Sequence, residues 1–198
     1  MINLPKLTLV LSLSTFALAS CANANSGETA ATDEQGEPAY TVTEIGEFNE
    51  QWAIEFAPGT DMLFITEKAG TLKMMDTANG TVGEVSGAPE VAYGGQGGLG
   101  DIAFLPSQSE QQLAGRTIYL SWAEAGDGET YGAAVGRGLL VCEDGSDCRV
   151  DGLEVIWRQS LKTGRRGHYS HRITFAPDEQ YMFIASGDRQ ELDPAQDN

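Results

Sequence analysis

The sequence predicts an all-β fold of the propeller type, on three observations. A five-residue pattern of an apolar residue, any residue, Phe, any residue and Pro occurs at residues 54–58, 102–106 and 173–177. Each copy precedes a turn and then a strand rich in β-branched and aromatic residues, and we expect no helix of ten or more residues. The first interval between copies suits one four-stranded blade of about 40–50 residues, and the longer second interval suits one blade with an insertion.

The repeat predicts an incomplete set of about three blades within residues 40–198. A β-sandwich is the rival fold, but the recurrence of the Phe-x-Pro pattern favours the propeller. Propellers close with about 4–8 blades, and an open set leaves strand edges unpaired. We therefore expect this chain to be the N-terminal part of a longer protein.

The N-terminus predicts a lipoprotein signal peptide over residues 1–20. A weakly basic start is followed by an apolar run over residues 7–18, too short to span a bilayer. The run ends in Leu-Ala-Ser before Cys21, which has the form of a lipidation site. The alternative is an ordinary secretory signal cleaved nearby. Residues 21–39 are small, polar and acidic, and predict a flexible tether.

The charge balance limits the partners. The chain carries 29 Asp and Glu residues against 12 Lys and Arg residues, a net charge of −17. Such a surface disfavours nucleic acid and anionic lipid as binding partners. We expect an exported protein on the periplasmic side that contacts the membrane only through its lipid anchor.

Two further cysteines, Cys142 and Cys148, flank an acidic turn between apolar segments. In an oxidising compartment this spacing predicts a disulfide across the end of a hairpin. The alternative, that the acidic turn at residues 143–147 is a calcium loop, is weaker because it lacks EF-hand spacing.

A glycine-rich segment at residues 94–100 contains the pattern GxGxxG. A dinucleotide site would need a following helix, whereas residues 101–105 predict a strand, so we reject that function. Glycines let a ligand approach the backbone closely, which makes Gln96 a candidate substrate contact. The alternative is a tight connection between blades.

Residues 167–189 hold both histidines of the chain, His168 and His171, and a predicted hairpin. The hairpin is expected to bring His168 close to Asp188 at its other end. A carboxylate that holds a histidine fixes its tautomer and stabilises the imidazolium, which builds a general base. The alternative is a surface histidine and a turn aspartate.

These two segments together resemble the soluble PQQ-dependent glucose/sorbosone (aldose sugar) dehydrogenases. The resemblance is carried by the Gly-Gln-Gly-Gly-Leu loop before a Phe-x-Pro strand, and by His168-x-x-x-Arg172-Ile173 followed by Ser-Gly-Asp188. Residues 195–197, Ala-Gln-Asp, also resemble bacterial members.

The resemblance implies a six-bladed propeller, calcium, and the cofactor pyrroloquinoline quinone (PQQ). It further implies oxidation of the anomeric hydroxyl of an aldose to the lactone, with electrons passing on to an external acceptor. His168 would take the hydroxyl proton while hydride passes to the quinone, Asp188 would hold His168, and Gln96 and Arg172 would contact substrate or cofactor.

The sequence also departs from the family pattern. Gly167 stands where the best-known glucose enzymes carry an acid, and His171 stands where a small residue is usual. Both departures put the sugar specificity in doubt, and whether His171 blocks or shapes the pocket stays open. The family's main cofactor-binding cations and calcium ligands belong to later blades. We therefore expect no metal ligands within this chain, and no turnover by these 198 residues alone.

Two other functions remain open from the sequence. One is a calcium-dependent lactonase or hydrolase on a propeller, and the other is a non-catalytic lipoprotein scaffold. The basic pair Arg165-Arg166 could steer an anionic cofactor, although a solvated pair is the simpler interpretation. The three tryptophans, Trp52, Trp122 and Trp157, are expected in the blade core, and Tyr169 is a candidate pocket residue.

Overall fold

A computed structural model describes residues 41–109, 112–144 and 147–193 of the chain, excluding the side chain of Asp144. The chain divides into two units, residues 1–44 and residues 45–198, and among the described residues only the second unit forms strands. The predicted signal peptide, the lipidation site Cys21, the acidic tether and residues 195–197 lie outside the described residues.

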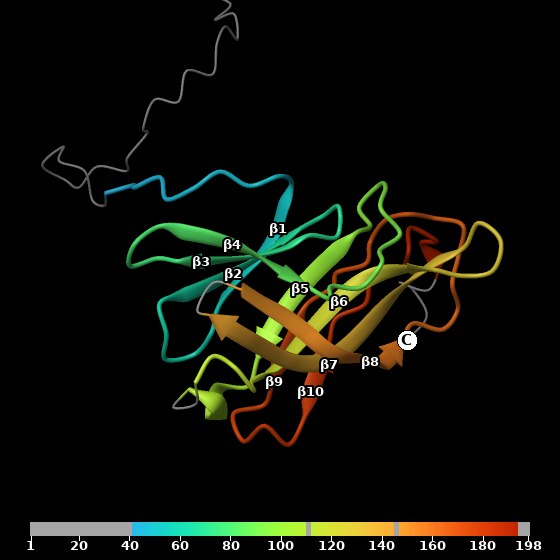
Figure 1. Ribbon diagram of the computed structural model, residues 1–198. Coiled ribbons are helices and arrows are strands. Elements are labelled where there is room, and N and C mark those ends of the chain that lie inside the picture. Colours follow the sequence, from blue (N-terminus) through green and yellow to red (C-terminus); the bar gives the residue numbers. More distant parts are fainter. Residues whose placement is uncertain (1–40, 110–111, 145–146, 194–198) are drawn as a thin grey trace, which may run out of the picture. The chain divides into compact units, whose positions relative to one another are not determined.

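The described residues of the second unit form ten strands and one short 3-10 helix (Figure 1). The first four strands are β1 (Gln51–Phe56), β2 (Met62–Glu67), β3 (Leu72–Asp76) and β4 (Thr81–Ser86). The next four are β5 (Leu99–Phe104), β6 (Thr117–Ala125), β7 (Tyr131–Asp144) and β8 (Asp147–Arg158), with the 3-10 helix η1 (Pro106–Gln108) after β5. The last two are β9 (Ile173–Phe175) and β10 (Met182–Ile184).

The strands form two complete blades and the first hairpin of a third. Strands β1–β4 pair antiparallel in chain order as blade 1, and β5–β8 do the same as blade 2. A short parallel contact between β4 and β8 joins the two outer edges, and β9 and β10 form a separate hairpin. In each copy of the Phe-x-Pro pattern, the Phe is the last residue of a first strand: β1 of blade 1, β5 of blade 2 and β9 of the third hairpin. The predicted all-β propeller fold is therefore confirmed.

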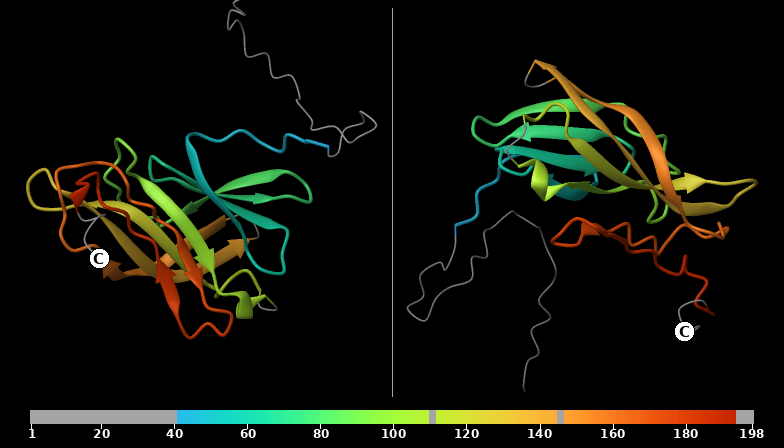
Figure 2. Two further views of the ribbon diagram at one scale, coloured as in Figure 1. Left: turned by 180° about the vertical axis from the view of Figure 1, so that it is seen from behind. Right: turned by 90° about the horizontal axis from the view of Figure 1, so that it is seen from below.

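Blades 1 and 2 pack against each other through a shared cluster of buried apolar residues. Every residue of β5 is buried, and Phe104 meets Phe64 of blade 1 edge-on with ring centroids 5.1 Å apart. On the other side of blade 2, Tyr119 packs against Phe175 of the β9–β10 hairpin at 4.9 Å. Figure 2 shows this hairpin lying alongside blade 2. Trp122 is buried in the core between blades 1 and 2, as expected from the sequence.

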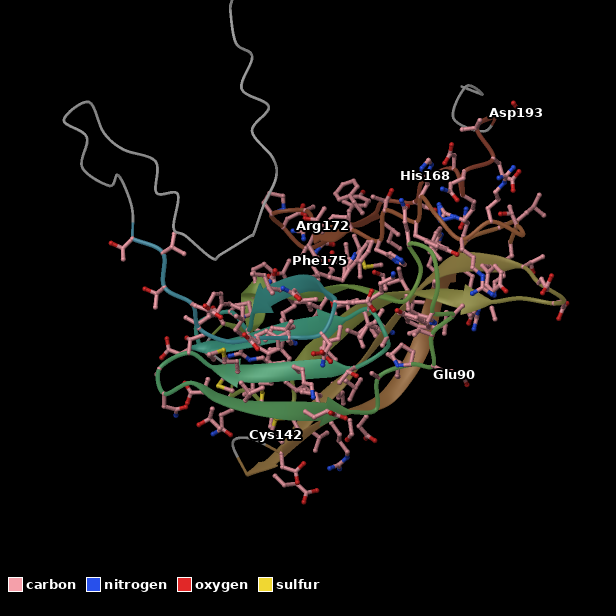
Figure 3. All side chains as sticks on the ribbon, turned by 90° about the horizontal axis from the view of Figure 1, so that it is seen from above. Glu90, Cys142, His168, Arg172, Phe175 and Asp193 are labelled. Atoms are coloured by element: carbon pink, nitrogen blue, oxygen red, sulfur yellow. A yellow bond between two sulfur atoms is a disulfide. The ribbon has the colours of Figure 1, made fainter. Side chains whose placement is uncertain are left out.

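The outer edge of blade 2 carries a disulfide between Cys142 and Cys148, which are opposite each other in the β7–β8 register. The sulfur of Cys148 also lies 3.8 Å from that of Met74 in blade 1. Cys142 lies far from His168, at the other side of the molecule (Figure 3). Within the described residues no helix has the length and apolar character to cross a membrane.

Candidate functional site

Strands β1, β5 and β9 are the first strands of blade 1, blade 2 and the third hairpin. They begin next to one another, and this end of the strands is the candidate site. Asp101 in β5 accepts a hydrogen bond from the backbone N–H of Ile173, the first residue of β9, at 2.7 Å. Trp52 of β1 meets the ring of His171 edge-on at 5.9 Å. The glycine-rich loop before β5 and the histidine loop before β9 therefore meet at one end of the inner strands.

His168 and Asp188 form the pair that the sequence predicts. Nδ1 of His168 lies 2.6 Å from Oδ1 of Asp188, and 47% of the histidine side chain is exposed against 13% of the aspartate side chain. The backbone N–H of Gln190 and the His168 ring hydrogen-bond to this carboxylate and hold the pKa of Asp188 below its ordinary value. Because an ionised carboxylate only accepts hydrogen bonds, Nδ1 of His168 is the donor.

The backbone of the histidine loop is unusual for non-glycine residues. His168, Ser170 and His171 all have positive φ angles, of 51°, 63° and 65°. This left-handed conformation is disfavoured for residues with a Cβ, and it persists where surrounding contacts impose it. The contacts come from the glycine-rich loop on one side and from the turn after β10 on the other.

Gln96 contacts the loop backbone. Its Oε1 accepts a hydrogen bond from the backbone N–H of His168 at 2.8 Å, and its own N–H donates to the carbonyl of Arg166 at 2.7 Å. The sequence suggests Gln96 as a substrate contact, and the structure brings it to the backbone of the candidate base. It also supports the alternative interpretation, in which the glycine-rich segment is a tight connection.

The glycines of this segment make room for the rings of the histidine loop. A Cβ on Gly97 would lie 3.1 Å from the ring of Tyr169, and one on Gly100 would lie 2.4 Å from Cγ of His171. Close backbone approach is therefore the reason for glycine at these positions, but the group that approaches is a side chain of the same protein.

His171 is buried behind the loop. Its ring stacks on Tyr169 at 5.3 Å, and neither ring nitrogen has a hydrogen-bond partner within the described part of the chain. Burial, together with the charge of Arg189, lowers its pKa to about 4. His171 and Tyr169 are therefore packing residues of the loop.

Arg172 lies at the same end of the inner strands as His168, but it lines a hollow that His168 does not line. With Trp52, Asp101 and Ser170 it lines a hollow of about 330 Å³ next to the start of β1. Its side chain is 64% exposed and its Nη1 lies 3.5 Å from Oδ1 of Asp101. Burial is the main cause that raises the pKa of Asp101, and likewise that of nearby Glu55.

Sequence reasoning missed the parts that Trp52 and Asp101 play at this end. The tryptophan was expected in the core, but its side chain is 42% exposed beside Arg172. Asp101 is an acidic residue near the start of a strand that is otherwise apolar. This signal in the sequence could have indicated that Asp101 belongs to the site.

The two basic residues before the histidine differ in their contacts. Arg166 donates to the carbonyl of Tyr93 at 3.0 Å, and its guanidinium lies 3.9 Å from the ring centroid of Tyr131. Arg165 is exposed, with its Nε 4.0 Å from a carboxylate oxygen of Glu191. Arg166 is therefore engaged in holding the loop, and Arg165 is the solvated member of the pair.

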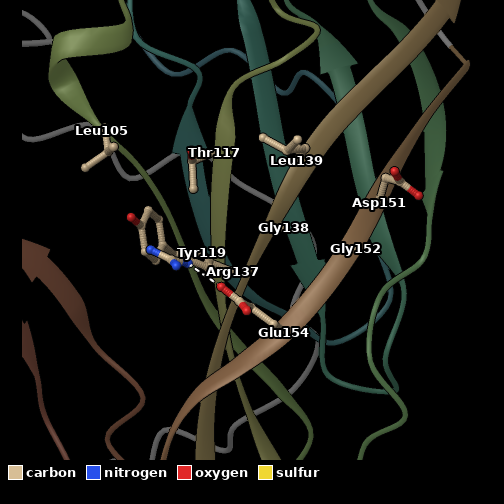
Figure 4. A pocket seen from close by; sticks show the side chains of 9 residues that line it. All are labelled: Leu105, Thr117, Tyr119, Arg137, Gly138, Leu139, Asp151, Gly152 and Glu154. Atoms are coloured by element: carbon tan, nitrogen blue, oxygen red, sulfur yellow. Dashed lines mark hydrogen bonds and ion pairs between the residues drawn. The ribbon is translucent and has the colours of Figure 1, made fainter.

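A second hollow, of about 440 Å³, lies on blade 2 (Figure 4). It is lined by residues of β6–β8 and by Leu105, and it contains the exposed ion pair of Arg137 with Glu154 at 2.7 Å. None of the candidate site residues lines it. Among the described residues, no three His, Cys, Asp or Glu side chains come together as a metal site.

In comparisons with known proteins, the family model and the sequence relative that match this chain both belong to sugar dehydrogenases. The family model described as Glucose / Sorbosone dehydrogenase matches residues 48–198. The chain is 34% identical over 146 residues to the aldose sugar dehydrogenase YliI of Escherichia coli (strain K12), covering 74% of this chain and 37% of that protein.

Solved structures agree. A crystal structure of a glucose dehydrogenase superposes with a TM-score of 0.69 at 32% identity, covering 79% of this chain and 44% of that one. The apo-form of the soluble aldose sugar dehydrogenase from Escherichia coli gives 0.64 at 33% identity, with coverages of 75% and 41%. The PQQ-bound aldose sugar dehydrogenase from Streptomyces coelicolor gives 0.59 at 22% identity, with coverages of 76% and 42%, and shows the fold alone.

The chain thus spans less than half the length of these relatives. The matched region includes both blades, the third hairpin and the loops that carry His168, Asp188 and Gln96. On this match the chain belongs to the glucose/sorbosone dehydrogenase family.

Proposed function

We propose that the protein oxidises an aldose sugar at its anomeric hydroxyl to the lactone, and that His168 is the general base. The observation that carries this proposal is the hydrogen bond of the half-exposed His168 ring to the nearly buried Asp188. A base that must reach a substrate needs one accessible ring nitrogen and one that is held.

The hydrogen bond to Asp188 supports Nε2 as the nitrogen that acts. Because Nδ1–H donates a hydrogen bond to Asp188, the neutral imidazole carries its lone pair on Nε2. Nε2 is then the atom that accepts the proton of the sugar hydroxyl. The carboxylate of Asp188 stabilises the imidazolium that results, and the Gln96 contact holds the backbone of His168 in place.

Oxidation of the sugar also requires a hydride acceptor, for which we propose PQQ. When bound, this quinone would take the hydride from the anomeric carbon. The residues present fit one part of such a planar, anionic group. Arg172 offers an exposed cation and Trp52 an exposed aromatic ring at the same hollow, and these two would hold a carboxylate and a ring face.

Calcium fits less well. No cluster of three metal-ligating side chains exists among the described residues, so the proposal assigns no calcium ligand to them. The external electron acceptor is likewise proposed as a partner of the complete protein.

We also propose that the protein is exported as a lipoprotein, held to the membrane through Cys21 and separated from it by the acidic tether. The disulfide of Cys142 with Cys148 supports an oxidising compartment. Labelling with a radioactive fatty acid tests this directly: incorporation that survives in Cys21→Ser would contradict it.

The enzymatic proposal is tested on the complete polypeptide with an aldose and an artificial dye as electron acceptor. We expect dye reduction that depends on added PQQ, lactone as product, and a loss of about 10²–10⁴-fold in kcat for His168→Ala. Arg137→Gln, which alters the exposed pair on blade 2 outside the candidate site, is the matched control and should retain activity. Lactone hydrolysis without dye reduction, or full activity of His168→Ala, would reject the proposal.

A further inference from the structure

We infer that Arg189 is a positioning residue, which holds the backbone of His168 so that its ring meets Asp188. The role of His168 in this inference rests on the proposed function, but the geometry of the loop does not. Arg189 is buried and acts from within the protein.

Arg189 is almost completely buried, with 1% of its surface exposed, and burial lowers its pKa. A buried guanidinium is costly unless other groups satisfy it. Its Nε and Nη1 nevertheless have no hydrogen-bond partner among the described residues. The contacts that Arg189 does make must therefore explain why this charge is inside.

Those contacts are with the histidine loop. Nη2 of Arg189 donates a hydrogen bond to the carbonyl oxygen of His168, and the guanidinium lies 4.4 Å from the ring centroid of Tyr169. A planar cation over an aromatic ring is a favourable arrangement, more so when water is excluded. One side chain thus holds two successive residues of the loop.

The carbonyl oxygen of His168 packs closely against the backbone of Gly187. A Cβ on Gly187 would lie 2.4 Å from this oxygen, so only glycine lets the carbonyl lie against the turn from which Arg189 extends. The N–H of His168 is held separately by Gln96 at 2.8 Å. Both backbone polar groups of His168 are therefore held by side chains, while Asp188 holds its ring.

This arrangement accounts for the left-handed conformation of His168, with φ at 51°. Without the hydrogen bond to its carbonyl, the residue is free to return to a conformation that is more favourable for a residue with a Cβ. The ring would then leave Asp188. Arg189→Lys keeps the charge but loses the planar group that stacks on Tyr169, so lysine should replace it poorly.

The loop geometry can be tested by NMR on this chain without any activity. In the wild type we expect a slowly exchanging guanidinium proton of Arg189 with nuclear Overhauser contacts to Tyr169, and a protected amide at His168. In Arg189→Gln and Arg189→Lys, the His168 amide should exchange at least about tenfold faster and the His168 Nδ1–H signal should be lost, while strand amides of β2 and β6 stay protected.

Arg165→Gln is the matched control, since Arg165 is exposed in the same loop. It should leave the signals of His168 unchanged. An unchanged His168 amide and ring signal in a folded Arg189 variant would overturn the inference. If both variants fail to fold, the wild-type spectrum decides, because a rapidly exchanging guanidinium without contacts to Tyr169 would equally reject it.

Kinetics of the complete polypeptide separate this inference from the proposed function. Arg189→Lys should lower kcat by about tenfold or more with little change in KM, because sugar binding does not involve Arg189. Normal loop signals with no sugar oxidation by the wild type would reject the proposed function and leave the positioning role intact. Sugar oxidation with an unchanged kcat in Arg189→Lys would do the reverse.

Discussion

Gly100 lies so close to His171 that a Cβ at position 100 would be 2.4 Å from Cγ of the imidazole. Gly97 stands in the same relation to Tyr169, at 3.1 Å. The glycine-rich loop of blade 2 and the histidine loop before β9 therefore interlock. Because His168 lies in the interlocked segment, the position of the candidate base depends on glycines of blade 2.

The first prediction concerns this interlock. Gly100→Ala should lower the free energy of unfolding by about 1–3 kcal/mol, since the added methyl group forces the buried ring of His171 to move. Chemical denaturation monitored by circular dichroism measures the change. The double variant Gly100→Ala with His171→Ala should cost less than the sum of the two single changes, because it restores the space.

Gly80→Ala is a suitable control for this experiment. Gly80 has a positive φ, of 77°, which Gly100 does not, and no atom lies within 4 Å of the place where its Cβ would be. It should therefore report only the backbone cost of about 1–2 kcal/mol. Simple additivity in the double variant would show that the two residues do not compete for space.

The second prediction is a pH dependence of stability caused by His171. Its pKa is lowered to about 4 in the folded protein, while an unfolded histidine has a pKa of about 6.5. As the pH falls below about 6.5, His171 therefore binds a proton in the unfolded state but stays neutral in the folded state. The stability contributed by the neutral ring is complete above pH 6.5, declines toward pH 4, and amounts to about 3 kcal/mol.

The measurement compares the wild type with His171→Phe between pH 7 and pH 4. Since both ring nitrogens lack hydrogen-bond partners within the described residues, an apolar ring should be tolerated at pH 7. The difference in free energy of unfolding should change in favour of the variant as the pH is lowered. Parallel curves for the two proteins would contradict the buried neutral state, and His171→Leu serves as a second variant.

The third prediction concerns Asp188. Hydrogen bonds from Gln190 and His168 lower the pKa of Asp188 in the folded protein. The ionised carboxylate therefore stabilises the folded turn at any pH above the pKa of an unfolded aspartate. This stabilisation is lost as the pH falls through the lowered pKa of the folded state. Asp188→Asn removes the charge and allows the wrong tautomer of His168. We expect kcat of the complete protein to fall by about 10²–10⁴-fold, with little change in KM.

Stopped-flow dye reduction over a range of pH measures this effect. The acid-side loss of stability expected for the wild type below about pH 4 should be smaller in the variant, since asparagine does not titrate. A variant with unchanged kcat would show that the carboxylate has no part in the reaction.

The fourth prediction separates the disulfide from the site. The double substitution of Cys142 and Cys148 by serine should lower the free energy of unfolding by about 2 kcal/mol, because the bond closes a short loop. The His168–Asp188 pair lies on the other side of the molecule, so the NMR signals of His168 should not change. A shift of those signals would indicate that the hairpin end influences the site.

The repeated Phe-x-Pro pattern explains why the fold could be predicted from the sequence. Phe56, Phe104 and Phe175 each end the first strand of a unit, and strand periodicity and turn residues are local signals. The pairing of His168 with Asp188 was also within reach, because a short hairpin joins the two. In contrast, the packing of His171 depends on Gly100, which belongs to another blade.

The sequence by itself determined the all-β fold, the blade repeat, the cysteine pair and the histidine–aspartate pair, since each of these depends on residues near one another in the chain. Only the tertiary structure decided that Gln96 holds the backbone of His168, that Trp52 is exposed beside Arg172, and that Arg189 is buried beneath the loop. The physical reason is that these contacts join residues brought together by the stacking of blades, and periodicity along one strand carries no information about which side chain from another blade will meet it.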